Sequence, residues 1–222
     1  MLLAIDTSTA QVGLALYDGT AVLGEMAWQS QAHHTEQLAP SLAELLKRTG
    51  TEMDSIKLLG VATGPGSFTS LRVGLAFVKG LALARHLPVV GIPTLDVVAA
   101  GMPPGDRNLA AVLQAGRHRL AVGWYQAEAG RWRSLGPAVS MTATELEDSI
   151  HKPVVICGEL SAEDRHCLGR RYKNVQLASP AKCVRRPGLL AELAWEKWHA
   201  GQVDPAQAIV PIYLHVAGGL PA

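Results

Sequence analysis

The chain has 222 residues, of which 48% are hydrophobic and 18% are charged. This composition excludes a disordered chain and is sufficient to build a sizeable core. The net charge of +1 argues against a strong general nucleic-acid binder. No apolar run approaches the roughly 20 residues that a membrane helix needs, and residues 1–6 lack the charged leader of a signal peptide. We therefore expect a cytoplasmic protein with no membrane partner.

The first half of the sequence alternates apolar strands with helices. Strands are expected at 2–6, 12–17, 21–28, 57–62 and 89–91, and helices at 34–48, 67–86 and 94–100. Asp18 and Gly19 supply a hairpin turn between the second and third strands. Pro40 lies inside the first helix, and we expect it to kink that helix or to mark a late start.

The second half repeats this order after a boundary rich in Pro and Gly at 102–106. Strands are expected at 109–115, 120–126, 132–139, 154–157 and 175–177, and helices at 142–150, 162–168 and 188–199. This boundary divides the chain into an N-terminal lobe over 1–101 and a C-terminal lobe over 106–222. The last helix is a candidate to pack back on the N-terminal lobe.

The repeated order of elements predicts the fold class. Three strands followed by helix, strand, helix, strand and helix are typical of a ribonuclease-H-like lobe. Strands joined by tight turns run antiparallel, and strands separated by helices run parallel. We therefore expect an α/β protein with two ribonuclease-H-like lobes in an actin-like (ASKHA) arrangement, each a mixed sheet with helices on both faces.

The segment Thr63–Gly74 joins a buried strand to a long apolar helix through a Gly-Pro-Gly turn. Glycines beside Pro65 permit backbone angles that a side chain would forbid, and Ser67 or Thr69 can cap the helix. A glycine-rich turn before a helix can bind a phosphate through free amides. The Lys and Ser or Thr of a P-loop are replaced here by Phe68 and Thr69. A phosphate site and a purely mechanical turn both stay open.

Groupings that would support metal or nucleophilic chemistry are absent from the sequence. His33 and His34 are adjacent, so their side chains point about 100° apart on a helix and cannot share an ion; alternatively, His34 packs at the helix N-terminus. Cys157, Cys167 and Cys183 form no Cys-x-x-Cys pair, and an odd number of cysteines is unsuited to a disulfide framework. We expect reduced, partly buried thiols, no metal site and no catalytic residue.

Several segments of the first half resemble the TsaB (YeaZ) family. They are AIDTST at 4–9 with VGLAL at 12–16, HTEQL at 34–38 and GPGSFTSLRVG at 64–74; in the second half, PIYL at 211–214 resembles the closing motif of the family. The resemblance implies a bacterial protein from the set that makes threonylcarbamoyladenosine beside the anticodon of tRNAs.

The resemblance further implies a noncatalytic activating or scaffold subunit rather than an enzyme. Its partner would be a TsaD-like transferase, with a TsaE-like ATPase acting through the complex. The chain would form a homodimer when alone, and it would contact tRNA only indirectly or weakly.

The resemblance also implies a vestigial nucleotide cleft that holds no cofactor. Its residues follow the first strand: Asp6, Thr7, Ser8 and Thr9. In the second lobe Gln114 stands where the family tends to show Asp, and a neutral amide binds magnesium more weakly than a carboxylate. The His-x-x-x-His metal motif of TsaD-like proteins is absent. The alternative function is an actin-like ATPase or small-molecule kinase that uses Asp6 as its metal anchor, with Glu159 as a candidate second carboxylate.

Two helices are expected to form the partner-binding surface. The residues expected there are Thr35, Leu38, Leu42, Leu45, Ser67, Phe68, Leu71, Arg72, Leu75, Val78 and Lys79. Exposed apolar side chains such as Leu42, Leu71 and Leu75 are expected to supply most of the interface energy. Small residues from Ala76 to Ala84 make a second stripe on the long helix, which lets another helix approach closely.

Glycine inside a helix costs roughly 1 kcal/mol against alanine, so Gly74 and Gly80 need a compensating reason. Packing within the lobe and contact with a partner helix are both open explanations.

A basic stretch lies near the end of the chain. Residues 165–186 contain seven Lys or Arg and no Asp or Glu. This pattern indicates either a solvated surface or an RNA-facing patch. The candidates for RNA contact are Arg170, Arg171, Lys173, Arg185 and Arg186.

Overall fold

The computed structural model describes residues 1–30, 33–170 and 173–214, which form two compact units. The first unit contains residues 1–97 and 185–212, and the second contains residues 98–184 together with the described residues 213 and 214. This division differs from the sequence-based lobes 1–101 and 106–222, because the chain leaves the second unit at Val184 and returns to the first. None of the helices within the described ranges is long and apolar enough to cross a membrane.

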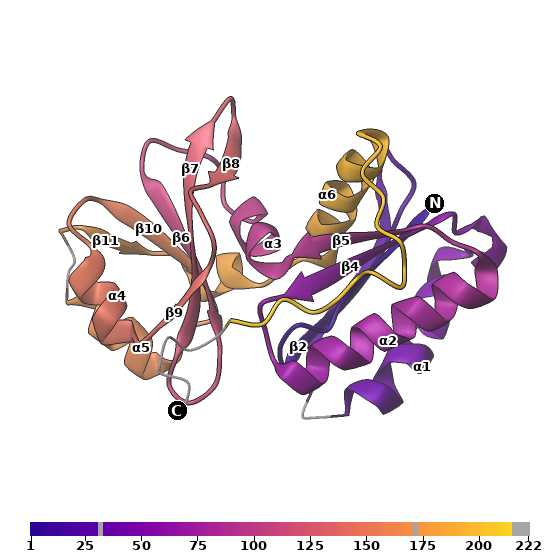
Figure 1. Cartoon of the computed structure of the whole chain (residues 1–222), viewed down its shortest axis with the longest axis horizontal. Helices are drawn as coiled ribbons and strands as arrows, with labels where there is room; N and C mark the ends of the chain where they lie inside the picture. Colours follow the sequence, from indigo (N-terminus) through magenta and orange to yellow (C-terminus); the bar gives the residue numbers. More distant parts are fainter. Residues whose placement is uncertain (31–32, 171–172, 215–222) are drawn as a thin grey trace, which may run out of the picture. The chain divides into compact units, whose positions relative to one another are not determined.

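The first unit is built on a five-stranded mixed sheet (Figure 1). Its elements in chain order are β1 (Leu2–Asp6), β2 (Gln11–Tyr17), β3 (Val22–Gln29), α1 (His34–Thr49), the short 3-10 helix η1 (Met53–Ser55), β4 (Leu58–Gly64), α2 (Phe68–Arg85), β5 (Val89–Pro93), α3 (Thr94–Ala100) and, after the chain returns, α6 (Pro187–His199). The strand order is β3-β2-β1-β4-β5, with β1 antiparallel to β2 and parallel to β4. As expected, neighbouring strands joined by a tight turn run antiparallel in this unit, and strands separated by a helix run parallel.

Both faces of this sheet are covered, since its central strands are buried at every position rather than at alternate positions. Leu3 and Ile5 of β1 face the core formed with α1 and α2, whereas Leu2 and Ala4 face α6. A Cβ added at Gly60 would lie 2.9 Å from Cβ of Ala194, so α6 lies very close to β4. Helix α6, which the sequence analysis assigned to the second lobe, therefore covers one face of the sheet of the first unit.

The second unit contains a smaller mixed sheet. Its elements are β6 (Asn108–Gln114), β7 (Leu120–Glu128), β8 (Arg131–Ser134), β9 (Val139–Met141), α4 (Ala143–Ser149), β10 (Val154–Gly158), α5 (Ala162–Gly169), β11 (Val175–Leu177) and the 3-10 helix η2 (Pro180–Cys183). The strand order is β11-β10-β6-β7-β8, and β9 pairs with β7. Leu146 of α4 and Leu168 of α5 pack into the core of this sheet.

Two local expectations differ from the structure. The strand expected at 132–139 is divided into β8 and β9, because Gly136 and Pro137 interrupt it and proline has no amide hydrogen for a strand ladder. Pro40 lies inside α1 and does not mark a late start, because the helix begins at His34 and runs continuously to Thr49. The fold class of mixed α/β units, each with helices packed on a mixed sheet, is confirmed.

Candidate functional site

The four residues expected to form a nucleotide cleft are buried beside the N-terminus of α2. They are Asp6, Thr7, Ser8 and Thr9. The carbonyl of Ser8 accepts a hydrogen bond from the amide of Ser67 at 2.7 Å. The Ser8 hydroxyl lies 2.8 Å from the hydroxyl of Thr94, which accepts from the amide of Gly64 at 3.0 Å. A Cβ on Gly66 would overlap the Ser8 carbonyl, so this turn needs glycine for close packing.

The N-cap residue of α2, Ser67, caps the helix with its side chain. Ser67 Oγ accepts from the amide of Ser70, which confirms one of the two expected caps. With the Ser67 amide bonded to Ser8, two donors that an anion would use at this helix start already have partners. The packing favours the mechanical interpretation of the Gly-Pro-Gly turn over the phosphate site.

Asp6 is held by a buried arginine from the far end of the sequence. Arg185 Nε donates to Asp6 Oδ2 at 2.8 Å, and the two side chains are 1% and 4% exposed. Asp6 Oδ1 accepts from the amide of Ser8 at 2.8 Å. Arg185 also donates to Thr9 Oγ1 at 2.9 Å, and its carbonyl accepts from Gln11 Nε2 at 2.7 Å. Both oxygens of the carboxylate are therefore engaged inside the protein.

This ion pair changes the interpretation of two residues. Arg185 is 2% exposed, so the expectation that it contacts RNA is wrong: its charge is used to neutralise Asp6. Asp6 would have to release Arg185 before it could ligate a magnesium ion. The residue types alone do not reveal this pair, because 179 positions separate its partners.

Six residues expected on the partner-binding surface lie in the core of the first unit. They are Leu38, Leu42, Leu45, Leu71, Leu75 and Val78, each at most 6% exposed. The expectation that Leu42, Leu71 and Leu75 are exposed is wrong, because these side chains face the sheet. They bury their apolar area on folding and leave at most 6% of it exposed.

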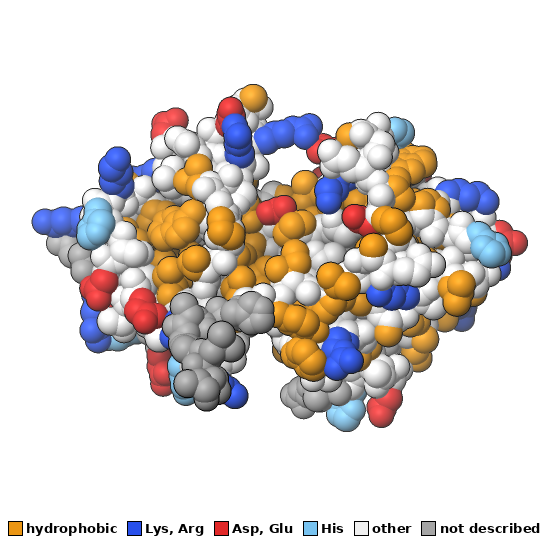
Figure 2. Space-filling view, viewed as in Figure 1, with side chains coloured by type: hydrophobic (Ala, Val, Ile, Leu, Met, Phe, Trp, Pro, Cys, Tyr) orange, Lys and Arg blue, Asp and Glu red, His pale blue; other side chains and the backbone are white. Residues whose placement is uncertain are grey.

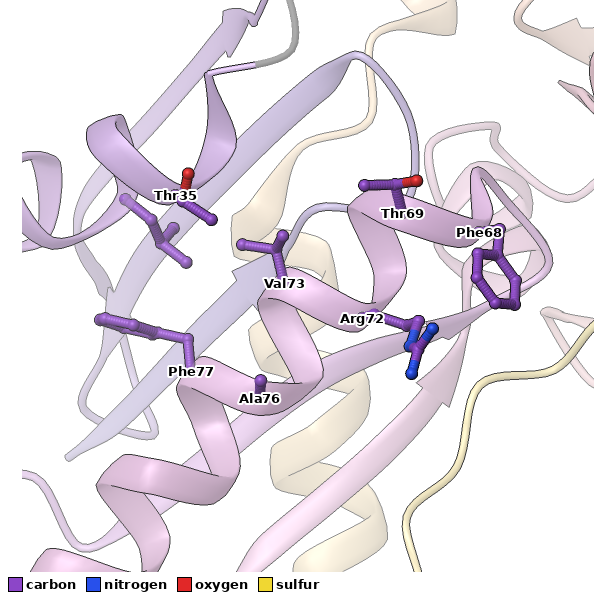
Figure 3. A pocket seen from close by; sticks show the side chains of 8 residues that line it. Thr35, Phe68, Thr69, Arg72, Val73, Ala76 and Phe77 are labelled. Atoms are coloured by element: carbon purple, nitrogen blue, oxygen red, sulfur yellow. The ribbon is translucent and has the colours of Figure 1, made fainter.

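Of the other expected residues, Thr35, Phe68 and Arg72 line a groove between α1 and α2 (Figure 3). Thr35, Ser67, Phe68 and Arg72 are exposed, whereas Lys79 is half-buried and donates to the carbonyl of Gln207 at 3.4 Å. The groove has a volume of about 470 Å³ and is lined by Thr35, Leu38, Phe68, Thr69, Arg72, Val73, Ala76 and Phe77. The Arg72 guanidinium carbon lies 4.9 Å from the centre of the Phe68 ring, a cation–π arrangement.

The exposed side of α2 carries hydrophobic side chains beside Lys or Arg side chains (Figure 2). Phe68 is 56% exposed and Leu83 is 74% exposed, which is high for large apolar residues. Ala76, Gly80 and Ala84 are also exposed on this helix. A face of this kind is typical of an interaction surface.

The two helical glycines of α2 have different explanations. A Cβ at Gly74 would overlap the Thr7 hydroxyl, so this position is explained by packing within the unit. A Cβ at Gly80 would meet nothing within 4 Å. Packing within the unit therefore does not explain Gly80, and contact with a partner helix stays a proposal.

The described histidines and the described part of the second unit supply no assembled metal site. His34 is buried with Nε2 3.0 Å from the carbonyl of Thr9, as the packing alternative expects. Gln114 donates to Asp164 Oδ2 at 2.8 Å, and Glu159 is half-buried. Across residues 1–30, 33–170 and 173–214, no group of three or more His, Cys, Asp or Glu is placed to hold a metal ion.

The basic stretch does not act as a single group. Arg170 and Lys173 are exposed in the second unit, and Arg171 lies outside the described residues. Arg186 belongs to the first unit and pairs with Glu25 at 2.7 Å.

Sequence reasoning placed Phe68 on this surface but missed Val73 and Phe77, of which Phe77 carried a signal. The chain has only two phenylalanines, Phe68 and Phe77, and both lie on α2 and line the groove. Val73 also lines it. In Figure 3, Val73 and Phe77 extend from α2 toward the Thr35 end of α1.

Comparisons with known proteins agree with this architecture. The family model of TsaD, described as tRNA N6-adenosine threonylcarbamoyltransferase, matches residues 24–174. The tRNA threonylcarbamoyladenosine biosynthesis protein TsaB of Escherichia coli is 36% identical over 100 residues, which are 45% of this chain and 43% of that protein. The alignment thus spans less than half of the E. coli protein.

A second TsaB aligns along nearly the whole chain. The Bacillus subtilis protein is 26% identical over 223 residues, covering 97% of this chain and 94% of that protein. The solved structure of YeaZ from Pseudomonas aeruginosa matches with a TM-score of 0.77 at 22% identity, covering 96% of this chain and 99% of that one. The actin-like (ASKHA) fold class is thereby supported, and the chain belongs to the TsaD family and, within it, to the TsaB (YeaZ) proteins.

Proposed function

We propose that this chain is a noncatalytic activating subunit in tRNA threonylcarbamoyladenosine biosynthesis and that it binds a TsaD-like transferase. The printed names of its TsaB relatives support the pathway. The observation that carries the proposal is the exposed apolar face of α2, with its groove beside α1.

The state of Asp6 supports the noncatalytic part of the proposal. A metal-anchoring carboxylate needs free oxygens directed at the ion, and both oxygens of Asp6 are bonded to Arg185 and to the Ser8 amide. The ATPase or kinase alternative would require this buried ion pair to break. Removing one partner of such a pair leaves an uncompensated buried charge, which costs about 3–5 kcal/mol. In the second unit the strand β6 ends in the neutral Gln114, which donates to Asp164 and supplies no second carboxylate.

The surface proposal rests on what remains exposed. Phe68, Val73 and Phe77 offer apolar area, and Arg72 adds a charge at the edge of the groove. Small side chains at Ala76 and Gly80 would let a partner helix approach α2 closely. We propose that the same face pairs with a second copy of the chain when the transferase is absent.

The remaining partners are proposed to act through the complex. A TsaE-like ATPase would bind the assembled complex rather than this chain alone. Weak tRNA contact would fall to Arg170 and Lys173, since Arg185 is buried and Arg186 is paired.

Reconstitution tests the function. The purified chain is expected neither to hydrolyse ATP nor to modify tRNA, and its addition to the transferase and the ATPase is expected to restore full modification. Full levels of modified tRNA without this chain would contradict the activating role. ATP turnover by the chain alone, lost in Asp6→Ala, would support the alternative function.

Co-purification with the transferase tests the surface. Ala76→Glu places a charge in the groove and is expected to abolish complex formation and self-association in size measurements. Glu163→Lys, on an exposed position of the second unit, is the control and is expected to leave both unchanged. Unchanged binding by Ala76→Glu would show that another surface is used.

A further inference from the structure

Two of the three cysteines lie side by side in the second unit. Cys157 is in β10 and is 1% exposed, whereas Cys183 ends η2 and is partly exposed. Their sulfur atoms are 3.8 Å apart, and the Cys157 thiol donates to Cys183 Sγ. The arrangement brings together residues that are 26 positions apart in the sequence.

An arginine from a third element completes this cluster. Arg165 of α5 donates from one nitrogen to the carbonyl of Ala178 at 3.0 Å and from another to Cys183 Sγ at 3.6 Å. The bond to the backbone holds the guanidinium in place. A fixed positive charge beside a partly exposed sulfur is the environment in which thiolates form and react.

We propose that Cys157 and Cys183 are an oxidation site of this protein, in which Cys183 reacts first with a peroxide and Cys157 then closes a disulfide. No contact with the first unit is needed for this reaction, and the proposal is independent of the partner-binding surface.

The protonation of the two sulfurs agrees with these roles. The hydrogen bond from Cys157, against the opposing effect of burial and together with the Gly158 backbone and Arg165, lowers the pKa of Cys183 to about 6. The hydrogen bond to Cys183 and burial raise the pKa of Cys157. The ionisable groups that interact with Cys183 are these two residues, and Lys182 on its own element is exposed.

The reaction balances in two steps. The Cys183 thiolate attacks one oxygen of hydrogen peroxide, so that an S–O bond forms, the O–O bond breaks and hydroxide leaves. The Cys157 sulfur then attacks the sulfenic sulfur of Cys183, forming the S–S bond and expelling a second hydroxide. That hydroxide takes the Cys157 proton, and the first is neutralised by the proton that Cys183 released when it ionised. In sum, two thiols are oxidised and one peroxide is reduced to two waters.

Cys167 provides an internal control on the same unit. Its thiol donates to Glu147 Oε2 at 3.3 Å, and burial together with this bond raises its pKa. It is therefore expected to stay a thiol at neutral pH and to react slowly with peroxide.

Peptide mapping of the full-length protein tests the proposal without any variant. After treatment with hydrogen peroxide and alkylation of the remaining thiols, we expect a cross-linked peptide pair containing Cys157 and Cys183, with Cys167 alkylated. In the untreated protein, Cys183 is expected to be alkylated at least about tenfold faster than Cys167 at pH 6. The alkylation rate of Cys183 itself should fall as the pH drops below about 6, because Cys183 then becomes protonated.

Two variants assign the roles of the sulfurs. Cys157→Ser is expected to leave Cys183 as a sulfenic acid that a dione probe captures, and Cys167→Ser is expected to leave the cross-link unchanged. Arg165→Gln is expected to slow the alkylation of Cys183, whereas Arg165→Lys should slow it less. Equal alkylation of Cys183 and Cys167, or peroxide treatment without a cross-linked pair, would overturn the proposal.

Discussion

The two sides of α2 both carry apolar and small residues, but one side is buried against the sheet and the other is exposed. The inner side packs Leu71, Leu75 and Val78 on the sheet and brings Gly74 against Thr7, beside the turn held by the Asp6 ion pair. The outer side exposes Phe68, Ala76, Gly80 and Leu83. Hydrophobic residues on both sides of a helix favour cover on both sides, and we propose that a partner covers the outer one. Only the structure shows which side the protein covers by itself.

The same substitution at two neighbouring residues, Leu75 and Ala76, tests this difference between the buried and exposed sides of α2. Leu75→Glu buries a charge and removes a core side chain, and we expect a loss of about 5 kcal/mol of the free energy of unfolding. Ala76→Glu is on the outer side and is expected to change this free energy by less than about 0.5 kcal/mol. Urea unfolding followed by circular dichroism measures both. Similar losses in the two variants would contradict the division of the helix into inner and outer sides.

Breaking the ion pair between Asp6 and Arg185 tests how much this pair stabilises the turn that packs on the inner side of α2. Asp6→Asn leaves Arg185 buried without a counter-charge, and we expect a loss of about 3 kcal/mol in the free energy of unfolding. The double variant Asp6→Asn/Arg185→Leu removes both charges and is expected to recover part of this loss. A single variant as stable as the unaltered protein would mean that the pair contributes little to closing the turn.

Gly74 tests the contact between the inner side and Thr7. In Gly74→Ala the new methyl group overlaps the Thr7 hydroxyl, and the strain exceeds the gain in helix propensity. We expect a net loss of about 1–2 kcal/mol in the free energy of unfolding. The double variant Gly74→Ala/Thr7→Ala removes the overlapping group, and recovery there would assign the strain to this contact.

Gly80 provides the opposite case on the outer side. Gly80→Ala meets no neighbour, so helix propensity alone acts, and we expect a gain of up to about 1 kcal/mol in the free energy of unfolding. If a partner helix approaches here, the same variant should bind the transferase more weakly in calorimetry. Greater stability together with unchanged binding would place the partner elsewhere on α2.

The fold was largely predictable from sequence because its signals are local. Apolar strands such as 2–6 and 58–64 and the turns between them set the order of elements. The return of the chain to the first unit at Arg185 was harder to predict. The apolar residues of α6 indicate that this helix packs on a sheet, but they do not identify which sheet. Leu190 and Ala194 would fit either unit equally well.

The candidate site was less predictable, for a related reason. Periodicity grouped Leu71 and Leu75 on one side of the helix correctly, but it gave no information on whether that side faces the sheet or a partner. The neutralisation of Asp6 by Arg185 depends on a contact across almost the whole chain. The glycines of the Gly-Pro-Gly turn were expected to permit special backbone angles, which Gly64 adopts with φ of 107°, whereas the close packing of Gly66 on Ser8 was not predicted.

The discontinuous first unit has a consequence for synthesis on the ribosome. Strands β1–β5 emerge first, but α6 and Arg185 follow only after the entire second unit. Until then one apolar face of the nascent sheet has no helix over it, and Asp6 has no cation to pair with. The amino-terminal half must therefore wait for the carboxy-terminal segment before it matures, which is the interval in which chaperone protection matters most.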